Sequence, residues 1–115
     1  MTLGLHISLE EIDQKIILRL EGRIDAATSS ILEKKIQTLI DEKRVHLLLD
    51  FSEVDYLSSA GMRVLLAALK KIKAKHGVFA LFSLSEDVNE IVRLAGFDKI
   101  LHLFPNEKEA LQHGI

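Results

Sequence analysis

The sequence contains no cysteine, which excludes a disulfide scaffold, a cysteine-ligated zinc site and thiol catalysis. An excess of charge of one sign is also missing, because 15 basic and 17 acidic residues give a formal net charge of -2. This balance does not indicate a general attraction to nucleic acid or to an anionic membrane surface. The longest apolar run, residues 64–69, is too short to cross a bilayer, and the N-terminus lacks the pattern of a signal peptide. We therefore expect a soluble protein that acts in the cytoplasm.

The patterns that are present predict one α/β domain over residues 1–115. Apolar residues make up 48% of the chain, enough for a single hydrophobic core at this length. Apolar runs predict five strands, over residues 5–9, 16–20, 45–49, 78–84 and 100–104. Amphipathic stretches predict four helices, which gives the order β-β-α-β-α-β-α-β-α. We expect a mixed, mostly parallel sheet covered by helices, with an antiparallel hairpin formed by the first two strands.

Individual residues predict where these elements begin and end. Gly22 is expected to end the second strand and Asp25 to cap the first helix, whose apolar stripe begins at Ile31. Asp50 is expected to end the third strand and to open a short polar loop. The later boundaries are predicted at Ser85, Gly96, the capping box of Asn106 and Glu109, and Gly114.

Ser58 and Ser59 stand where that polar loop gives way to a strongly predicted helix. A hydroxyl there accepts a hydrogen bond from a free helix N–H, and capping alone accounts for most serine pairs in this position. Two details favour a functional role. Ala60 and Gly61 are small, so the helix start would be open to an approaching backbone or ligand. A phosphate would be tolerated by the helix dipole but would add charge and bulk to the surrounding surface, which predicts a switch acting on a partner.

A serine hydrolase is the enzymatic alternative, and it needs a base near the serine and a carboxylate that orients the base. The pattern Gly-x-Ser-x-Gly is absent, and the histidines are scattered, with His46 at a strand start and His76 at a helix end. No two histidines stand at i, i+2 or i, i+4, and no phosphate-binding glycine motif occurs. We expect no catalysis, metal or cofactor, and we interpret the lysines of residues 70–75 as a solvated helix end.

Three segments carry a resemblance to a known family. They are Gly-Arg-Ile-Asp-Ala-Ala-Thr at residues 22–28, Leu-Leu-Leu-Asp-Phe-Ser at 47–52, and Tyr-Leu-Ser-Ser-Ala-Gly-Met-Arg-Val-Leu-Leu at 56–66. In this order and at these spacings they resemble a stand-alone STAS domain, specifically an anti-sigma factor antagonist, over essentially the whole chain. The resemblance implies the STAS fold and a regulatory protein that is not an enzyme.

The resemblance also implies a mechanism. In this family the unphosphorylated protein binds an anti-sigma factor that is also a serine kinase, and this frees the sigma factor for RNA polymerase. The kinase phosphorylates one serine, which weakens the complex, and a PP2C-type phosphatase resets it. Aligned on Gly61, the family pattern Asp-Ser-x-Gly-Leu makes Ser59 the phosphoacceptor. Ser58 takes the position of the aspartate, which makes it a competing acceptor, and Met62 takes that of the leucine.

The implied partner surface spans two helix starts, because Asp25 matches the family's aspartate that contacts the kinase. The expected partner-binding residues are Asp25, Thr28, Ser58, Ser59, Ala60, Gly61, Met62 and Arg63. Two other functions stay open. One is a STAS adaptor or scaffold in a stress-signalling or transporter complex, with Ser59 never phosphorylated; the other is a sensor of a small ligand or nucleotide. We expect a monomer when free, because the predicted surface shows no long apolar patch.

Overall fold

The computed structural model describes residues 4–113, so the predicted role of Gly114 lies outside the described residues. The elements follow the predicted order. They are β1 (Leu5–Ile12), β2 (Lys15–Ile24), α1 (Ser29–Asp41), β3 (His46–Leu57), α2 (Ser59–Ala74), β4 (Val78–Phe82), α3 (Glu86–Leu94), a short 3-10 helix (Phe97–Lys99), β5 (His102–Phe104) and α4 (Glu107–His113). Caps at Ser85 and Asn106 are confirmed, because their side chains accept hydrogen bonds from the backbone N–H groups of Val88 and Glu109.

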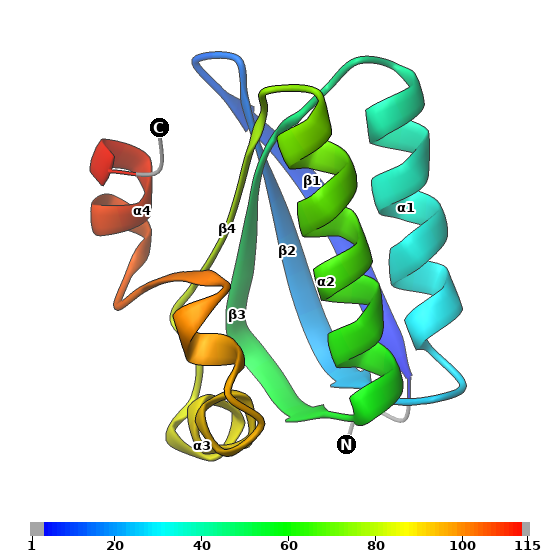
Figure 1. The fold of residues 1–115 in the computed structure, drawn as a ribbon, viewed down its shortest axis with the longest axis vertical. Helices are drawn as coiled ribbons and strands as arrows, with labels where there is room; N and C mark the ends of the chain where they lie inside the picture. The colour runs from blue at the N-terminus through cyan, green and yellow to red at the C-terminus, as the bar shows by residue number, and fades with distance from the viewer. Residues whose placement is uncertain (1–3, 114–115) are drawn as a thin grey trace.

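The strands form one five-stranded sheet in the order β1-β2-β3-β4-β5. The first two strands form the predicted antiparallel hairpin, and the remaining neighbours pair in parallel. Helices α1 and α2 lie side by side over one face of the sheet, with α3 near its lower end (Figure 1). Helix α4 follows β5 and packs against the opposite face through Ala110. The prediction of an α/β fold with a mixed sheet is confirmed.

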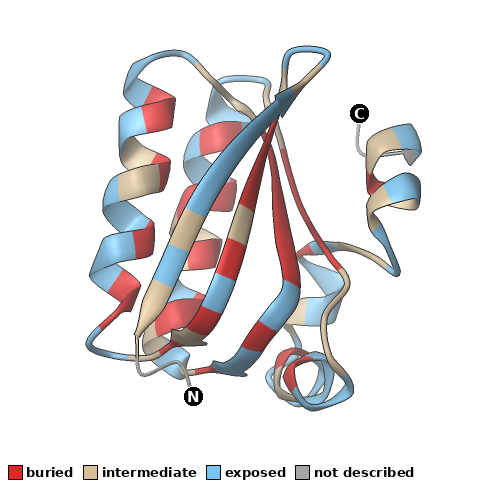
Figure 2. Cartoon of the chain, turned by 180° about the vertical axis from the view of Figure 1, so that it is seen from behind, coloured by how far each residue is buried: buried red, intermediate tan, exposed pale blue. Residues whose placement is uncertain are grey.

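Strand β3 runs through the middle of the sheet and is buried on both faces at its start. Leu47 and Leu49 pack into the cluster beneath α1 and α2. Leu48 points the other way, into a smaller cluster with Phe82 and Ala110. Figure 2, which shows the sheet from behind, marks the start of β3 and the neighbouring parts of the sheet as buried. Since a strand covered on both faces has no polar side, its sequence is a continuous apolar run.

The predicted ends of the first four strands are wrong. Strand β1 runs three residues further than predicted and β4 ends two residues earlier, whereas β2 and β3 are extended at the edge that carries the serines. Strand β2 continues through Gly22 to its end at Ile24. Gly22 has φ 122 and stands at a register shift, so it forms a bulge inside the strand, in a conformation that glycine adopts readily. Strand β3 continues past Asp50, because Val54 and Leu57 still point into the core while the polar residues around them face solvent. This extension carries the chain directly to the start of α2.

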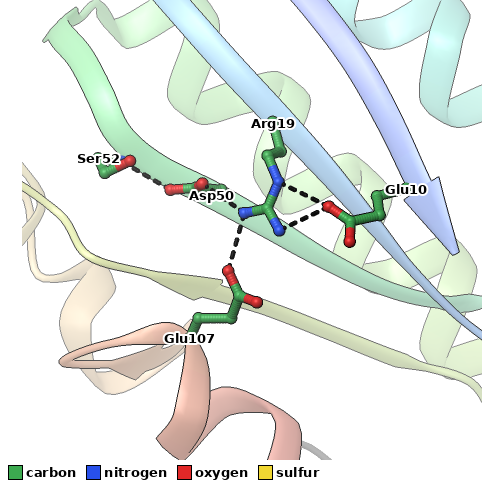
Figure 3. Close-up of polar contacts among 5 residues, drawn as sticks. All are labelled: Glu10, Arg19, Asp50, Ser52 and Glu107. Atoms are coloured by element: carbon green, nitrogen blue, oxygen red, sulfur yellow. Dashed lines mark hydrogen bonds and ion pairs between the residues drawn. The ribbon is translucent and has the colours of Figure 1, made fainter. Parts of the chain in front are cut away.

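A polar cluster centred on Arg19 ties four elements together (Figure 3). The guanidinium contacts the carboxylates of Glu10, Asp50 and Glu107 at 2.8 Å each. Asp50 also accepts a hydrogen bond from the backbone N–H of Ser52 at 2.9 Å. The carboxylates, with Glu107 contributing most, raise the pKa of Arg19. Because Glu107 opens α4, this cluster holds α4 to the three strands that carry the other residues.

Candidate functional site

The ends of β2 and β3 bring two helix starts to one edge of the sheet. The parallel register places Ile24 beside Leu57, and the backbone N–H of Ser58 donates to the carbonyl oxygen of Ile24 at 2.8 Å. Helices α1 and α2 therefore both begin at this edge (Figure 1). In open α/β folds the edge at the carboxyl ends of the strands is the usual binding edge.

The two serines at this edge have different surroundings. Ser58 is the N-cap of α2, and its Oγ accepts a hydrogen bond from the backbone N–H of Gly61 at 3.1 Å. Ser59 is the first residue of α2 and is exposed. Within residues 4–113 its hydroxyl forms no hydrogen bond. The prediction that the pair lies at a helix cap is confirmed, and the hydroxyl of Ser59 is the one open to an approaching protein.

Gly61 packs against the ends of both strands. A Cβ at this position would lie 2.7 Å from Cγ2 of Ile24 and 2.8 Å from Cδ1 of Leu57. Gly61 is buried, so its small size serves the close approach of α2 to the sheet. The interpretation that Gly61 leaves the helix start open to a partner is therefore wrong, although Gly61 fixes the position of the serines.

Asp25 and Thr28 rigidify the turn before α1. The Oδ1 of Asp25 accepts hydrogen bonds from the backbone N–H groups of Ala27 and Thr28 at 3.0 and 2.9 Å. The hydrogen bond from Thr28 is the main cause that lowers the pKa of Asp25. The hydroxyl of Thr28 in turn accepts from the backbone N–H of Asp25 and donates to the carbonyl oxygen of Arg23. Because α1 begins at Ser29, Asp25 caps this turn and not the helix itself.

The sequence analysis missed an aromatic and basic pair at the same edge. Arg23 and Tyr56 are neighbours in the register of β2 and β3, and Cζ of Arg23 lies 4.6 Å from the ring centroid of Tyr56. Its Nε also lies 3.6 Å from Oδ2 of Asp25. The position of the Arg23 guanidinium over the Tyr56 ring is that of a cation–π contact. The pairing depends on the extension of β3 beyond Asp50, so recognising two parallel strands that end together would have found it.

The expected partner-binding residues differ in exposure. Ser59 and Arg63 are exposed, Asp25, Ser58 and Ala60 are half-buried, and Thr28, Gly61 and Met62 are buried. Met62 is only 7% exposed and packs in the main core. The solvent-facing surface of this edge is therefore made by Ser59 and Arg63 together with the accessible parts of the half-buried residues, and the buried residues hold these side chains in place.

The histidines that flank the segment lie far from Ser59. His46 begins β3 and His76 follows α2, so both stand at the opposite end of elements whose near ends adjoin Ser59. Among the described residues, no group of three or more His, Asp or Glu side chains is placed to hold a metal ion. Over the same residues, no helix has the length and apolar character needed to span a membrane. What the edge presents is an exposed hydroxyl at a helix N-terminus, beside a carboxylate and a guanidinium.

Comparison with known proteins gives this edge a family context. The family model for the STAS domain matches residues 6–110. RsfB of Mycobacterium tuberculosis, an anti-sigma-F factor antagonist, is 33% identical over 97 residues, which cover 83% of this chain and 77% of that protein. The crystal structure of an anti-sigma factor antagonist from Mycobacterium paratuberculosis superposes with a TM-score of 0.86 at 26% identity, covering 96% of this chain and 93% of that one.

A further solved structure has the same fold at lower identity. The Bacillus cell fate determinant SpoIIAA in its phosphorylated form has a TM-score of 0.71 and 21% identity, and the match covers 93% of this chain and 97% of that one. The family model, which matches residues 6–110, includes both helix starts at the edge described above. The chain therefore belongs to the STAS domain family.

Proposed function

We propose that this protein is an anti-sigma factor antagonist of the cytoplasm, switched by phosphorylation of Ser59. The unphosphorylated protein binds an anti-sigma factor with serine kinase activity and so releases a sigma factor for transcription. Phosphate on Ser59 ends that interaction, and a phosphatase of the PP2C type restores it. RsfB, which is an anti-sigma-F factor antagonist, supports the general role by its 33% identity.

The different surroundings of the two serines carry the proposal. The hydroxyl of Ser59 is exposed and has no hydrogen bond within the described chain, so a kinase could reach it without unfolding α2. The hydroxyl of Ser58 is engaged with the N–H of Gly61, so its phosphorylation would disturb the cap. Ser59 is therefore favoured over Ser58 as the phosphoacceptor.

A phosphate on Ser59 would be compatible with the fold but would change the surface. The N-terminal end of α2 carries a partial positive charge that favours an anion, and Arg63 stands one helical turn further on. The phosphate would add roughly two negative charges. Facing an acidic or apolar partner surface, this would cost about 2–4 kcal/mol, roughly a 30- to 1000-fold loss of affinity.

The partner surface would combine the start of α2 with the turn before α1. Asp25 is held in place by two backbone N–H groups, and its carboxylate is half-exposed. A rigid side chain loses little conformational entropy on binding, which favours affinity. We include Asp25, Ser59, Ala60 and Arg63 in the contact surface, and we assign Thr28, Gly61 and Met62 the role of positioning it.

The test is capture of a partner from a lysate of the source organism on immobilised protein, with and without Mg-ATP. The wild-type protein should capture a kinase and release it when ATP is added, with phosphate appearing on Ser59. Ser59→Ala should retain the kinase in the presence of ATP, and Ser59→Asp should fail to capture it. The matched control, Ser58→Ala, should behave as the wild type.

The adaptor function makes the opposite forecast in the same experiment. A constitutive STAS adaptor would keep its partner with or without ATP, and both serines would stay unmodified. A wild-type protein that behaves in this way would contradict the switch. Phosphate found on Ser58 alone would contradict the assignment of Ser59.

A further inference from the structure

Strand β1 forms a long edge of the sheet. Its neighbour is β2 on one side, so the other side of its backbone has no strand partner within the sheet. The register with β2 is unbroken from Leu5 to Ile12, so β1 has no bulge, and the segment contains neither proline nor lysine. Bulges, prolines and lysines are common devices by which edge strands avoid pairing with another chain. Figure 2 shows β1 at the margin of the sheet with most of its length exposed.

An apolar groove adjoins this edge. Ile7 of β1 lines it together with Ile31, Lys34, Lys35 and Thr38 of α1, and its volume is about 420 Å³. The sequence analysis placed Ile31 in the core stripe of its helix, which is wrong, because Ile31 is 47% exposed. Neither lysine ammonium forms a hydrogen bond or an ion pair with the rest of residues 4–113. The groove therefore favours an extended segment that offers apolar and acidic side chains.

The sequence of β1 itself has this chemistry. Leu5, Ile7 and Leu9 alternate on the face toward α1, and Leu9 is 41% exposed. Glu11 continues the same face and Glu10 follows on the other. A second β1 would therefore bring apolar side chains to the groove. It would also bring one carboxylate, that of Glu11, to the side of the groove lysines, where it would exchange its ion pair with Arg44 of its own chain for a contact with a lysine.

In place of the monomer expected from the sequence, we propose that two copies of this chain pair their β1 strands antiparallel, with Ser8 of one copy opposite Ser8 of the other. In this register Ile7 faces Leu9 of the second copy, and His6 faces Glu10. Because the dimer is two-fold symmetric, each of these two facing pairs occurs twice. No glutamate lies opposite a glutamate of the other copy, so the register avoids like-charge repulsion. The free edge lies beyond β2, away from β3 and the serines that follow it. The dimer thus leaves the Ser59 edge accessible and does not depend on the proposed function.

The association is testable by sedimentation velocity over a range of protein concentrations. The sedimentation coefficient of the wild type should rise with concentration from that of a monomer to that of a dimer. Leu9→Lys should raise the dissociation constant by about tenfold or more, because it places a charge opposite Ile7. The matched control is Leu94→Lys on α3, where Leu94 is 74% exposed and lies outside β1. It should leave the dissociation constant unchanged.

The register is testable by cysteine cross-linking, since the natural chain has no cysteine. Facing residues in an antiparallel pair have Cα atoms about 4.5–5.5 Å apart, within the range for a disulfide. Ser8→Cys should therefore form a disulfide-linked dimer under mild oxidation. His6→Cys is the matched control, also exposed and on the same face, but its counterpart would lie about 13 Å away along the strand.

Two results would overturn the proposal. One is a wild-type sedimentation coefficient that does not change with concentration. The other is disulfide formation by Ser8→Cys that is no faster than by His6→Cys, which would show random collision or a different register. Leu9→Lys should still capture the partner of the Ser59 edge in the lysate experiment. Dimer formation and partner binding can therefore fail independently of each other.

Discussion

Removing the hydroxyl of Ser58 should destabilise the fold, whereas removing that of Ser59 should not. The Oγ of Ser58 accepts a hydrogen bond at 3.1 Å from the N–H of Gly61, and Ser58 is half-buried. Replacing a serine N-cap with alanine costs about 1 kcal/mol, within a range of about 0.5–2 kcal/mol. The hydroxyl of Ser59 is exposed and has no partner in the described chain, so Ser59→Ala should change the free energy of unfolding by less than about 0.5 kcal/mol.

Urea-induced unfolding followed by far-UV circular dichroism measures both changes. Ser58→Ala should lower the midpoint without changing the slope, which reports a change in stability alone. Ser58→Asp is the conservative rescue, because a carboxylate also accepts from the helix N–H groups and favours the positive end of the dipole. It should be at least as stable as the wild type. A Ser59→Ala variant that loses as much stability as Ser58→Ala would refute the division of roles between the serines.

Two further predictions concern charged groups elsewhere in the chain. Hydrogen bonds from the backbone N–H groups of Thr28 and Ala27, that from Thr28 first, lower the pKa of Asp25 below its ordinary value. The stabilisation by Asp25 is therefore complete above the ordinary pKa of an aspartate and is lost as the pH falls through the folded-state pKa. When the pH is lowered below about 4, the free energy of unfolding measured in urea should fall less for Asp25→Asn than for the wild type. An equal fall in both proteins would contradict this account. Arg19→Met should cost about 1–3 kcal/mol and speed amide hydrogen exchange in α4, because Glu107 loses its partner; unchanged exchange in α4 would show that the cluster does not hold that helix.

Local patterns predicted the order of the elements and most of their caps, because short-range spacing determines both. Ser58 and Ser85 each precede an amphipathic run, and a serine there has a free helix N–H to bind whatever the rest of the fold does. The second half of β3 was missed for a physical reason. Within residues 52–57 only Val54 and Leu57 are buried while the intervening residues face solvent, so the composition is that of a loop.

The contacts that could not be predicted join residues far apart in the sequence. Arg19 and Glu107 are 88 positions apart, and their contact depends on α4 crossing to the second face of the sheet. Spacing also gave the wrong reason for Gly61, because the Cβ clash with Ile24 is visible only once α2 is packed on β2. Ile31 was assigned to the core by its helical spacing, although the sheet ends at β1 and leaves that side of α1 uncovered.

The most direct test of the central claim is to map the phosphate after incubation with the captured kinase and Mg-ATP, and to measure the stability of the product. The account predicts phosphate on Ser59, an unfolding midpoint close to that of the unmodified protein, and loss of kinase binding. Phosphate on Ser58, or a phosphorylated protein that still binds the kinase as tightly as before, would contradict it.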